Sequence, residues 1–165
     1  MKKLIIAALA VAAATTMYAQ GTVNMVSANV VTYGDSCGAL AGTKVGSEIT
    51  ANLMYEGNVV ASEAFNVSSK GAPTGKIKGA LVSTSLPAGT TVSGLTVQAI
   101  NPTDSLYNGE SAPFSYTTGD PADPTKLADA QLMFDSFTVE YIPEPTTIAL
   151  GILGLSSLLV FRRRD

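Results

Sequence analysis

The C-terminal end of the chain imposes the strongest constraint on how it can fold. Sixteen residues from Thr146 to Phe161 carry no charge, and Arg162, Arg163 and Arg164 follow at once. The run lacks the polar face that an amphipathic helix of a soluble core shows, which is the alternative interpretation. As a helix it is about 24 Å long, slightly shorter than a hydrocarbon core of about 30 Å. Bilayer thinning and snorkelling arginines close that gap, so the pattern predicts a single transmembrane helix.

The N-terminus carries a second apolar run with a different character. Lys2 and Lys3 precede an uncharged stretch from Leu4 to Ala14, and small residues follow it. This order is typical of a secretory signal peptide, here residues 1–19, removed after Ala19. An N-terminal membrane anchor is the alternative, but the run is short of the about 20 apolar residues that span a bilayer. Met17 is larger than the residue usually found before a cleavage site, so the exact bond stays open.

The two terminal segments predict the same orientation. Arginines remain on the cytoplasmic side of a membrane, whereas a signal peptide directs the following chain across it. The expected division is therefore a signal peptide (1–19), an exported body (20–142) and a membrane-anchored tail (143–165).

Pro143-Glu144-Pro145 separates the body from the apolar run. The prolines cannot extend a helix backwards and hold the backbone extended, so the tripeptide is expected to be an exposed acidic marker. A Pro-Glu-Pro motif, a hydrophobic helix and a terminal arginine cluster occur here in that order, from Pro143 to Arg164. This arrangement resembles the tail of PEP-CTERM proteins of Gram-negative bacteria.

The resemblance implies a sorting pathway. Such tails are substrates of exosortase, a membrane-embedded cysteine protease that is thought to cut near the motif and to release or transfer the body to the cell surface. The precursor would be held transiently in the inner membrane, and these proteins are associated with extracellular polysaccharide and biofilm. The class joins unrelated bodies to a shared tail, so the resemblance implies little about residues 20–142.

The body is acidic and of ordinary domain size. Its 123 residues include five lysines, eleven carboxylates and no arginine, which gives a formal charge of −6. An acidic surface repels phosphate backbones, so nucleic acid is not an expected partner. Cys37 is the only cysteine, so no internal disulfide can form. It is expected to be a partly buried residue beside turn glycines; an intermolecular bridge or a reactive thiol is the alternative.

The body predicts an all-β fold. Ile49, Ala51, Leu53 and Tyr55 alternate with polar residues along Glu48–Tyr55, as in a half-buried strand. A hairpin is expected at Glu56-Gly57-Asn58, followed by the strand VVASEAF. The further expected strands are Thr22–Ser27, Asn29–Tyr33, Lys76–Val82, Thr90–Ile100, Pro113–Thr117 and Met133–Tyr141. Short strands separated by turns are typical of an antiparallel β-sandwich, either Ig-like or jelly-roll-like.

Two details of the last third can be checked directly. In Met133–Tyr141, the residues Met133, Phe137, Val139 and Tyr141 are expected on one face, with Phe134, Ser136, Thr138 and Glu140 on the other. One helical turn is expected at Thr125–Leu132, after a loop at Asp120–Pro124.

The residue types present exclude several activities. The chain has no histidine, which rules out Ser-His-Asp triads, Cys-His pairs and histidine metal sites. No glycine-rich loop has the phosphate-binding spacing, and scattered carboxylates do not define a glycosidase pair. The body is therefore expected to be non-enzymatic and without a cofactor.

Calcium is the remaining chemical hypothesis for the body. Carboxylate and amide oxygens at loop ends can bind Ca²⁺. The candidate ligands are Asp104 and Glu110, with Asn101 and Asn108, in one loop, and Asp120 and Asp123 in another. Ordinary solvated turns are the alternative, because Asp and Asn favour turns.

The sequence as a whole predicts an exported protein of the cell surface or extracellular matrix, sorted through its C-terminal motif. The alternative is a carbohydrate-binding module for matrix polysaccharide. Because the chain has no tryptophan, that function would require exposed tyrosines on one sheet face.

Overall fold

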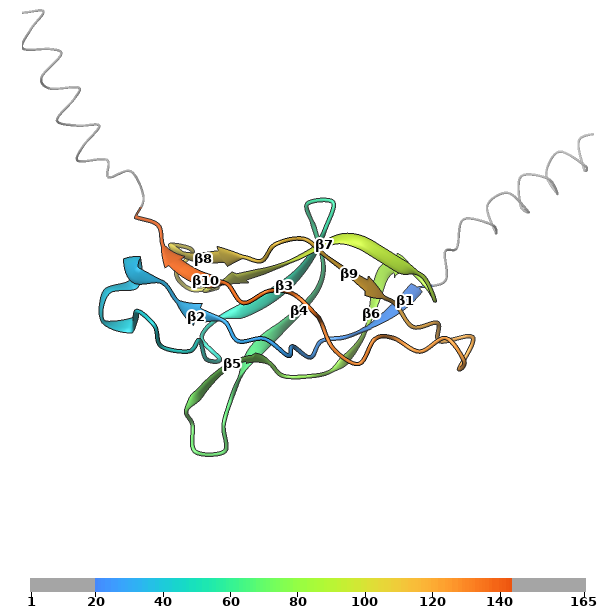
Figure 1. Cartoon of the computed structure of the whole chain (residues 1–165), viewed down its shortest axis with the longest axis horizontal. Helices are drawn as coiled ribbons and strands as arrows, with labels where there is room; N and C mark the ends of the chain where they lie inside the picture. Colours follow the sequence, from blue (N-terminus) through green and yellow to red (C-terminus); the bar gives the residue numbers. More distant parts are fainter. Residues whose placement is uncertain (1–19, 144–165) are drawn as a thin grey trace, which may run out of the picture.

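The computed structural model describes residues 20–143. This part of the chain is mostly β-structure, as expected, and Figure 1 shows its strands arranged along one long axis. The strands are β1 (Gln20–Asn24), β2 (Thr32–Tyr33), β3 (Thr50–Tyr55), β4 (Asn58–Val67), β5 (Pro73–Ile77), β6 (Leu81–Pro87), β7 (Thr91–Ile100), β8 (Tyr107–Glu110), β9 (Phe114–Thr117) and β10 (Thr138–Tyr141). One 3-10 helix, η1 (Asp35–Leu40), follows β2.

Eight strands form one sheet and two form a separate ribbon. The large sheet has the order β2-β10-β8-β7-β3-β4-β5, with β9 also paired to β7. The ribbon consists of β1 and β6. All strand pairs are antiparallel except β10 and β2, which run parallel. The expectation of a purely antiparallel arrangement is therefore wrong at this pair, because the last strand returns beside an early one through a long connection.

The large sheet curves until its two end strands come close together. Val31, next to β2, donates its N–H to the Gly75 carbonyl of β5 at 2.8 Å, and Gly75 donates to the Val45 carbonyl at 2.9 Å. A Cβ on Gly75 would lie 2.5 Å from the Val31 carbonyl oxygen, and the Gly75 φ of +68° favours glycine in any case. The contact covers backbone groups that an open sheet edge would leave exposed.

One hydrophobic core joins the ribbon to the large sheet. Its largest fully buried side chains are Tyr116, Phe65 and Phe134. The predicted alternation along Glu48–Tyr55 is confirmed, since Ile49, Ala51 and Leu53 are completely buried. Alternating strands therefore supply this core as the sequence pattern indicates.

The expected hairpin between β3 and β4 is also confirmed. Its two central residues, Glu56 and Gly57, have φ values of +49° and +77°. Two consecutive residues with positive φ match the turn type whose twist suits a two-residue hairpin.

Other expected boundaries are wrong. The predicted strand Lys76–Val82 is the end of β5 and the start of β6, and Thr125–Leu132 contains no helical turn. The first two predicted strands are shorter than expected, and β8 lies where the sequence indicated only a loop. Gly79 and Ala80, between β5 and β6, belong to no strand and allow the chain to pass from the sheet to the ribbon.

The side-chain orientations predicted for Met133–Tyr141 agree with the structure only at the C-terminal end of this segment. Val139 is buried as expected, but Phe134 is 1% exposed and Met133 is 63% exposed, the reverse of the prediction. The residues before Thr138 do not form a strand, so strict alternation does not apply to them. The side-chain amide of Asn29 donates to the Phe134 carbonyl and fixes this irregular stretch against the segment before β2.

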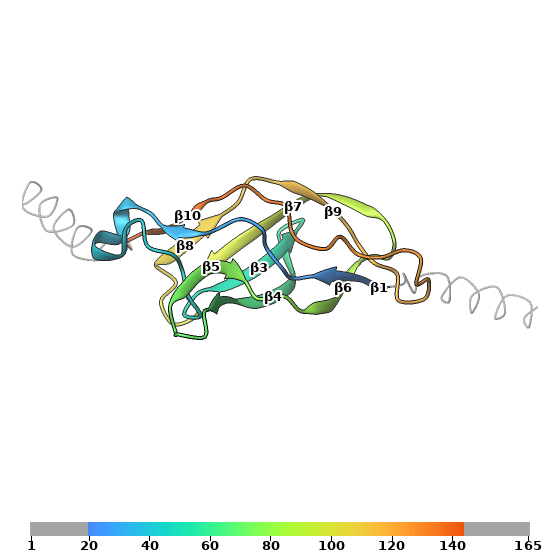
Figure 2. The same ribbon diagram turned by 60° about the horizontal axis from the view of Figure 1, so that its bottom comes forward.

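The two ends of the described chain lie at opposite ends of the long axis. Figures 1 and 2 place the start of β1 at one end and the end of β10 at the other, beside β2 and η1. No helix within residues 20–143 is long and apolar enough to cross a bilayer. The predicted signal peptide and transmembrane helix fall outside the described residues.

Candidate functional site

The junction between the body and the predicted sorting tail is the first candidate site. On one side β10 is antiparallel to β8, with Glu140 opposite Asn108 and Tyr141 opposite Tyr107. The Ile142 N–H then donates to the Leu106 carbonyl at 2.7 Å. Backbone pairing therefore continues to the residue immediately before Pro143, and no linker separates the folded body from the motif.

Residues at the start of η1 hold the other side of β10. Ser36 donates its hydroxyl to the Glu140 carboxylate, and its oxygen accepts the Tyr141 N–H at 2.7 Å. Gly34 donates its N–H to the Val139 carbonyl at 2.9 Å. The hydroxyls of Ser36 and then Thr138 lower the pKa of Glu140, because they stabilise its charged form. The end of β10 is thus held by backbone and side-chain contacts together.

Cys37 belongs to this same junction. The thiol is buried and donates to the Val139 carbonyl at 3.1 Å, on the β10 backbone. It lies between Gly34 and the positive-φ residue Gly38. The expectation of a small buried residue beside turn glycines is confirmed, and the side chain serves as a packing and hydrogen-bonding group.

The residues of the motif itself are largely outside the described range. Pro143 is exposed and is the last described residue. Glu144, Pro145 and the arginine cluster Arg162, Arg163 and Arg164 lie beyond it, so the roles expected for them stay predictions.

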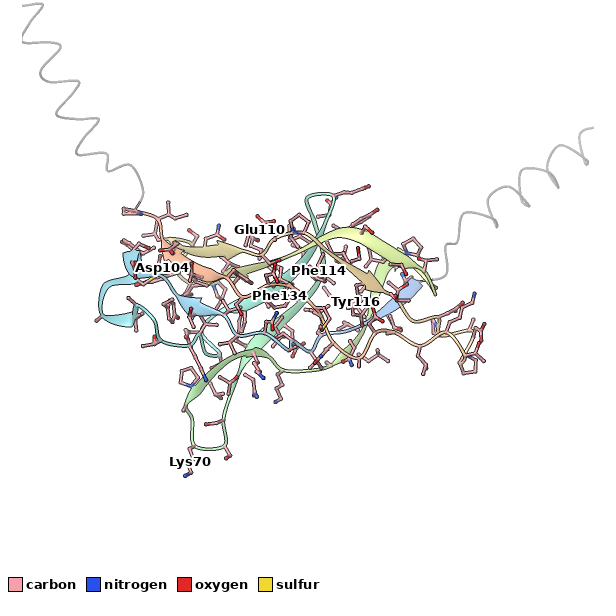
Figure 3. All side chains as sticks on the ribbon, in the orientation of Figure 1. Lys70, Asp104, Glu110, Phe114, Tyr116 and Phe134 are labelled. Atoms are coloured by element: carbon pink, nitrogen blue, oxygen red, sulfur yellow. The ribbon has the colours of Figure 1, made fainter. Side chains whose placement is uncertain are left out.

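The first pair of candidate calcium ligands is not brought together. Asp104 lies before β8 and accepts the Leu106 N–H at 3.1 Å, whereas Glu110 ends β8 and accepts the Thr96 hydroxyl at 2.7 Å. Figure 3 shows the two labelled side chains well apart along the sheet. Asn101 caps its own turn by accepting the Thr103 N–H at 2.9 Å. These contacts are those of ordinary Asx turns and strand pairs.

The second pair also forms local turns. Asp120 accepts the Ala122 N–H at 2.9 Å, and Asp123 accepts the Thr125 hydroxyl at 2.6 Å and its N–H at 3.0 Å. The hydroxyl and N–H of Thr125 lower the pKa of Asp123. Within residues 20–143, no three acidic or cysteine side chains converge as a metal site would require.

Aromatic residues form two clusters, and both lie in or pack against the hydrophobic core. Tyr107 lies between Tyr33 and Tyr141, at centroid distances of 6.0 and 5.2 Å. Phe134 lies between Phe114 and Phe137, at 5.9 and 5.8 Å. Every tyrosine in the described range is buried or half-buried. The exposed tyrosine platform required by the carbohydrate-binding alternative is therefore not formed by residues 20–143.

A surface hollow of about 540 Å³ lies beside β2 and was not indicated by the sequence. It is lined by Tyr33, Leu40, Thr43, Lys44, Glu48 and Pro73. One carboxylate oxygen of Glu48 accepts the Tyr33 hydroxyl and the Gly46 N–H, each at 2.8 Å. Five of the six lining residues lie between Tyr33 and Glu48, and Pro73 of β5 joins them because the sheet curves back, a contact that local spacing does not indicate.

At this hollow the pKa of Glu48 is lowered and the pKa of Tyr33 is raised. Partial burial opposes ionisation of Glu48, but hydrogen bonds from its own N–H, the Tyr33 hydroxyl and the Gly46 N–H outweigh it and lower the pKa. Burial, and then the Glu48 carboxylate, raise the pKa of Tyr33. At neutral pH the hollow therefore holds a charged carboxylate bonded to a neutral phenol.

The described chain is thus an all-β domain whose last strand leads directly into the predicted sorting motif. No protein-family model, curated protein or solved structure matches the chain.

Proposed function

We propose that this chain is an exported protein of the PEP-CTERM class, anchored transiently in the inner membrane and then processed by an exosortase-type protease near Pro143-Glu144-Pro145. The mature body would reside at the cell surface or in the extracellular matrix without catalysis of its own. The observation that carries this proposal is the order of the motif, the charge-free run and the arginine cluster at the end of a chain that begins like a signal peptide.

The structure of the body is compatible with this use. The chain leaves the fold through β10, and the N-terminal strand starts at the opposite end of the long axis (Figure 1). A body anchored through residue 143 would have its β1 end directed away from the anchor. Cleavage after Ala19 would leave Gln20 as the first residue of β1, so signal-peptide removal would leave that strand complete.

The finer fold assignment is also a proposal. We assign the body to the β-sandwich architecture, with the β1–β6 ribbon and the curved sheet as two layers around the shared core. The parallel β2–β10 pair distinguishes it from a purely antiparallel Ig-like or jelly-roll domain.

Replacing Glu144 in the native host tests the sorting role. The wild-type chain should change from a membrane-bound precursor to a shorter surface or secreted form. Mass spectrometry of the C-terminus detects this change. Glu144→Ala should remain as the precursor, because the acidic residue between the prolines is lost. Asp135→Ala, which removes an exposed carboxylate from the body, is the matched control and should be processed normally. If Glu144→Ala is processed as the wild type is, the motif has no role in cleavage.

The carbohydrate-binding alternative has less support, because the described tyrosines are not exposed. A glycan array with the purified full chain separates the two. Saturable binding to one glycan class would favour the alternative, and no binding would leave the structural role.

A further inference from the structure

Positive charge in the body is concentrated in one segment. Residues 64–103 contain Lys70, Lys76 and Lys78 and no carboxylate. The rest of the body holds two lysines and all eleven carboxylates, a formal charge of −9. The domain therefore combines a basic segment with a strongly acidic remainder, although its net charge alone indicates only an acidic protein.

The fold places these lysines on a projecting hairpin. The segment joining β4 to β5 extends from the sheet in Figure 1, and Figure 3 shows Lys70 at its tip. Lys76 and Lys78 are exposed on either side of the buried Ile77, so both side chains point away from the core. The three ammonium groups thus belong to one outward-facing element, which we call the lysine hairpin (residues 67–78).

The lysine hairpin is held in shape before any partner binds. Ser68 donates its N–H to the Ala72 carbonyl at 2.8 Å, and Gly71 donates to the Ser68 carbonyl at 2.8 Å. The Thr74 hydroxyl donates to the Asn66 carbonyl at 2.7 Å, across the two strands. A hairpin ordered in advance loses little conformational entropy on binding.

Apolar surface accompanies the charge. Val67 at the base of the hairpin is 38% exposed, and Pro73 is also exposed. Pro73 borders the hollow beside β2, which Lys44 and the charged carboxylate of Glu48 also line. Four of the five body lysines therefore lie on or beside this element, next to apolar groups that a bound surface could cover.

We propose that the lysine hairpin docks onto the carboxylate-bearing surface of a second copy of this chain. Charge complementarity favours this partner, because the same molecule presents net −9 outside residues 64–103, including the exposed Asp35, Asp129 and Asp135. The lysine hairpin and these carboxylates lie on different segments, so a single contact can repeat head-to-tail, whereas two reciprocal contacts would give a closed two-fold dimer. A head-to-tail contact that does not close into a ring generates open-ended chains.

The contact is weak for one pair of molecules and sensitive to salt. Exposed ion pairs contribute little individually, and their range falls from about 30 Å at 0.01 M salt to about 8 Å at 0.15 M. Association therefore depends on high local concentration, as on a crowded surface, and it weakens as ionic strength rises.

Sedimentation velocity of the full chain in a mild detergent tests the proposal, at 0.01 M and 0.15 M NaCl. The wild type should form species larger than a single protomer at low salt, with apparent affinity falling by about tenfold or more at the higher salt. The variant Lys70→Gln/Lys76→Gln/Lys78→Gln should remain a single protomer at both. Circular dichroism melts of each variant verify that the fold is retained.

A matched control has the same net-charge change at other places. Ser85→Glu/Ser105→Glu/Ser136→Glu also shifts the formal charge by −3, at exposed serines outside the lysine hairpin. This control should associate at least as strongly as the wild type. Association that persists in the lysine variant, or that both variants lose equally, overturns the proposal. So does an absence of self-association together with lysine-dependent binding to a polyuronate, since the partner would then be a polyanion.

Discussion

Gly75 provides the sharpest test of the curved sheet. Its φ is +68°, and a Cβ at this position would lie 2.5 Å from the Val31 carbonyl oxygen and 2.6 Å from a methyl carbon of Val30. The perturbation is Gly75→Ala. The added methyl group cannot fit unless β5 and the segment before β2 separate.

The expected cost has two parts. An alanine held at positive φ loses about 1–2 kcal/mol. Separation of the strands weakens the hydrogen bonds from Val31 to Gly75 and from Gly75 to Val45, each contributing about 0.5–1.5 kcal/mol. Gly75→Ala should therefore lower the free energy of unfolding by about 2–5 kcal/mol.

Gly71→Ala is the matched control. Gly71 also has a positive φ, of +79°, but a Cβ there would meet nothing within 4 Å. It should lose only the backbone part, about 1–2 kcal/mol. Urea unfolding of residues 20–143 followed by circular dichroism measures both variants. Equal losses would refute the inference that close approach at Gly75 holds the ends of the sheet together.

Three further predictions concern single side chains and calcium. Tyr116→Phe should lose about 1–3 kcal/mol of stability in urea unfolding, because the hydroxyl donates to the Asp129 carbonyl at 2.7 Å and accepts the Asn24 N–H at 2.8 Å. Tyr55→Phe is the control, and equal losses from both variants would contradict a stabilising role for the Tyr116 hydroxyl. The lowered pKa of Glu48 means that its contribution is present above the ordinary value of 4.5 and is lost as pH falls through the lower folded value. Glu48→Gln should thus lose less stability than the wild type when the pH is lowered. The difference in the free energy of unfolding should be below about 1 kcal/mol, since the group is largely exposed. An unchanged dependence of stability on pH would contradict the prediction. Millimolar calcium should leave the Tm of the body unchanged within about 1 °C, because the candidate carboxylates cap separate turns, and a larger rise that a chelator reverses would restore a calcium site.

Local patterns in the sequence predict the elements whose cause is local. The alternation from Ile49 to Leu53 and the turn at Glu56-Gly57 both depend on neighbours within a few residues, and both are confirmed. The long strand β7 is expected at nearly its observed bounds for the same reason. Local steric and burial preferences were sufficient at these places.

The remainder depends on contacts between distant residues. Phe134 is buried outside any strand because the Asn29 side chain fixes its backbone from a distance of 105 positions in sequence. The parallel pairing of Thr138 with Thr32 leaves no periodic signal in either segment. The hollow beside β2 likewise depends on a distant contact, because Pro73 of β5 closes it against residues 33–48.

The attachment of β10 bears directly on how the proposed sorting motif could be processed. The last backbone hydrogen bond, from Ile142 to Leu106, ends one residue before Pro143, which has no N–H to continue the ladder. A tail anchored beyond residue 145 would therefore place β8, β10 and η1 close to the membrane surface, at about 3.3 Å or less per extended residue. A protease that binds residues upstream of the motif in an extended form must first separate Tyr141 and Ile142 from β8 and Ser36. The stability of these contacts at the end of β10, rather than that of the whole body, then sets how readily Tyr141 and Ile142 can enter a protease.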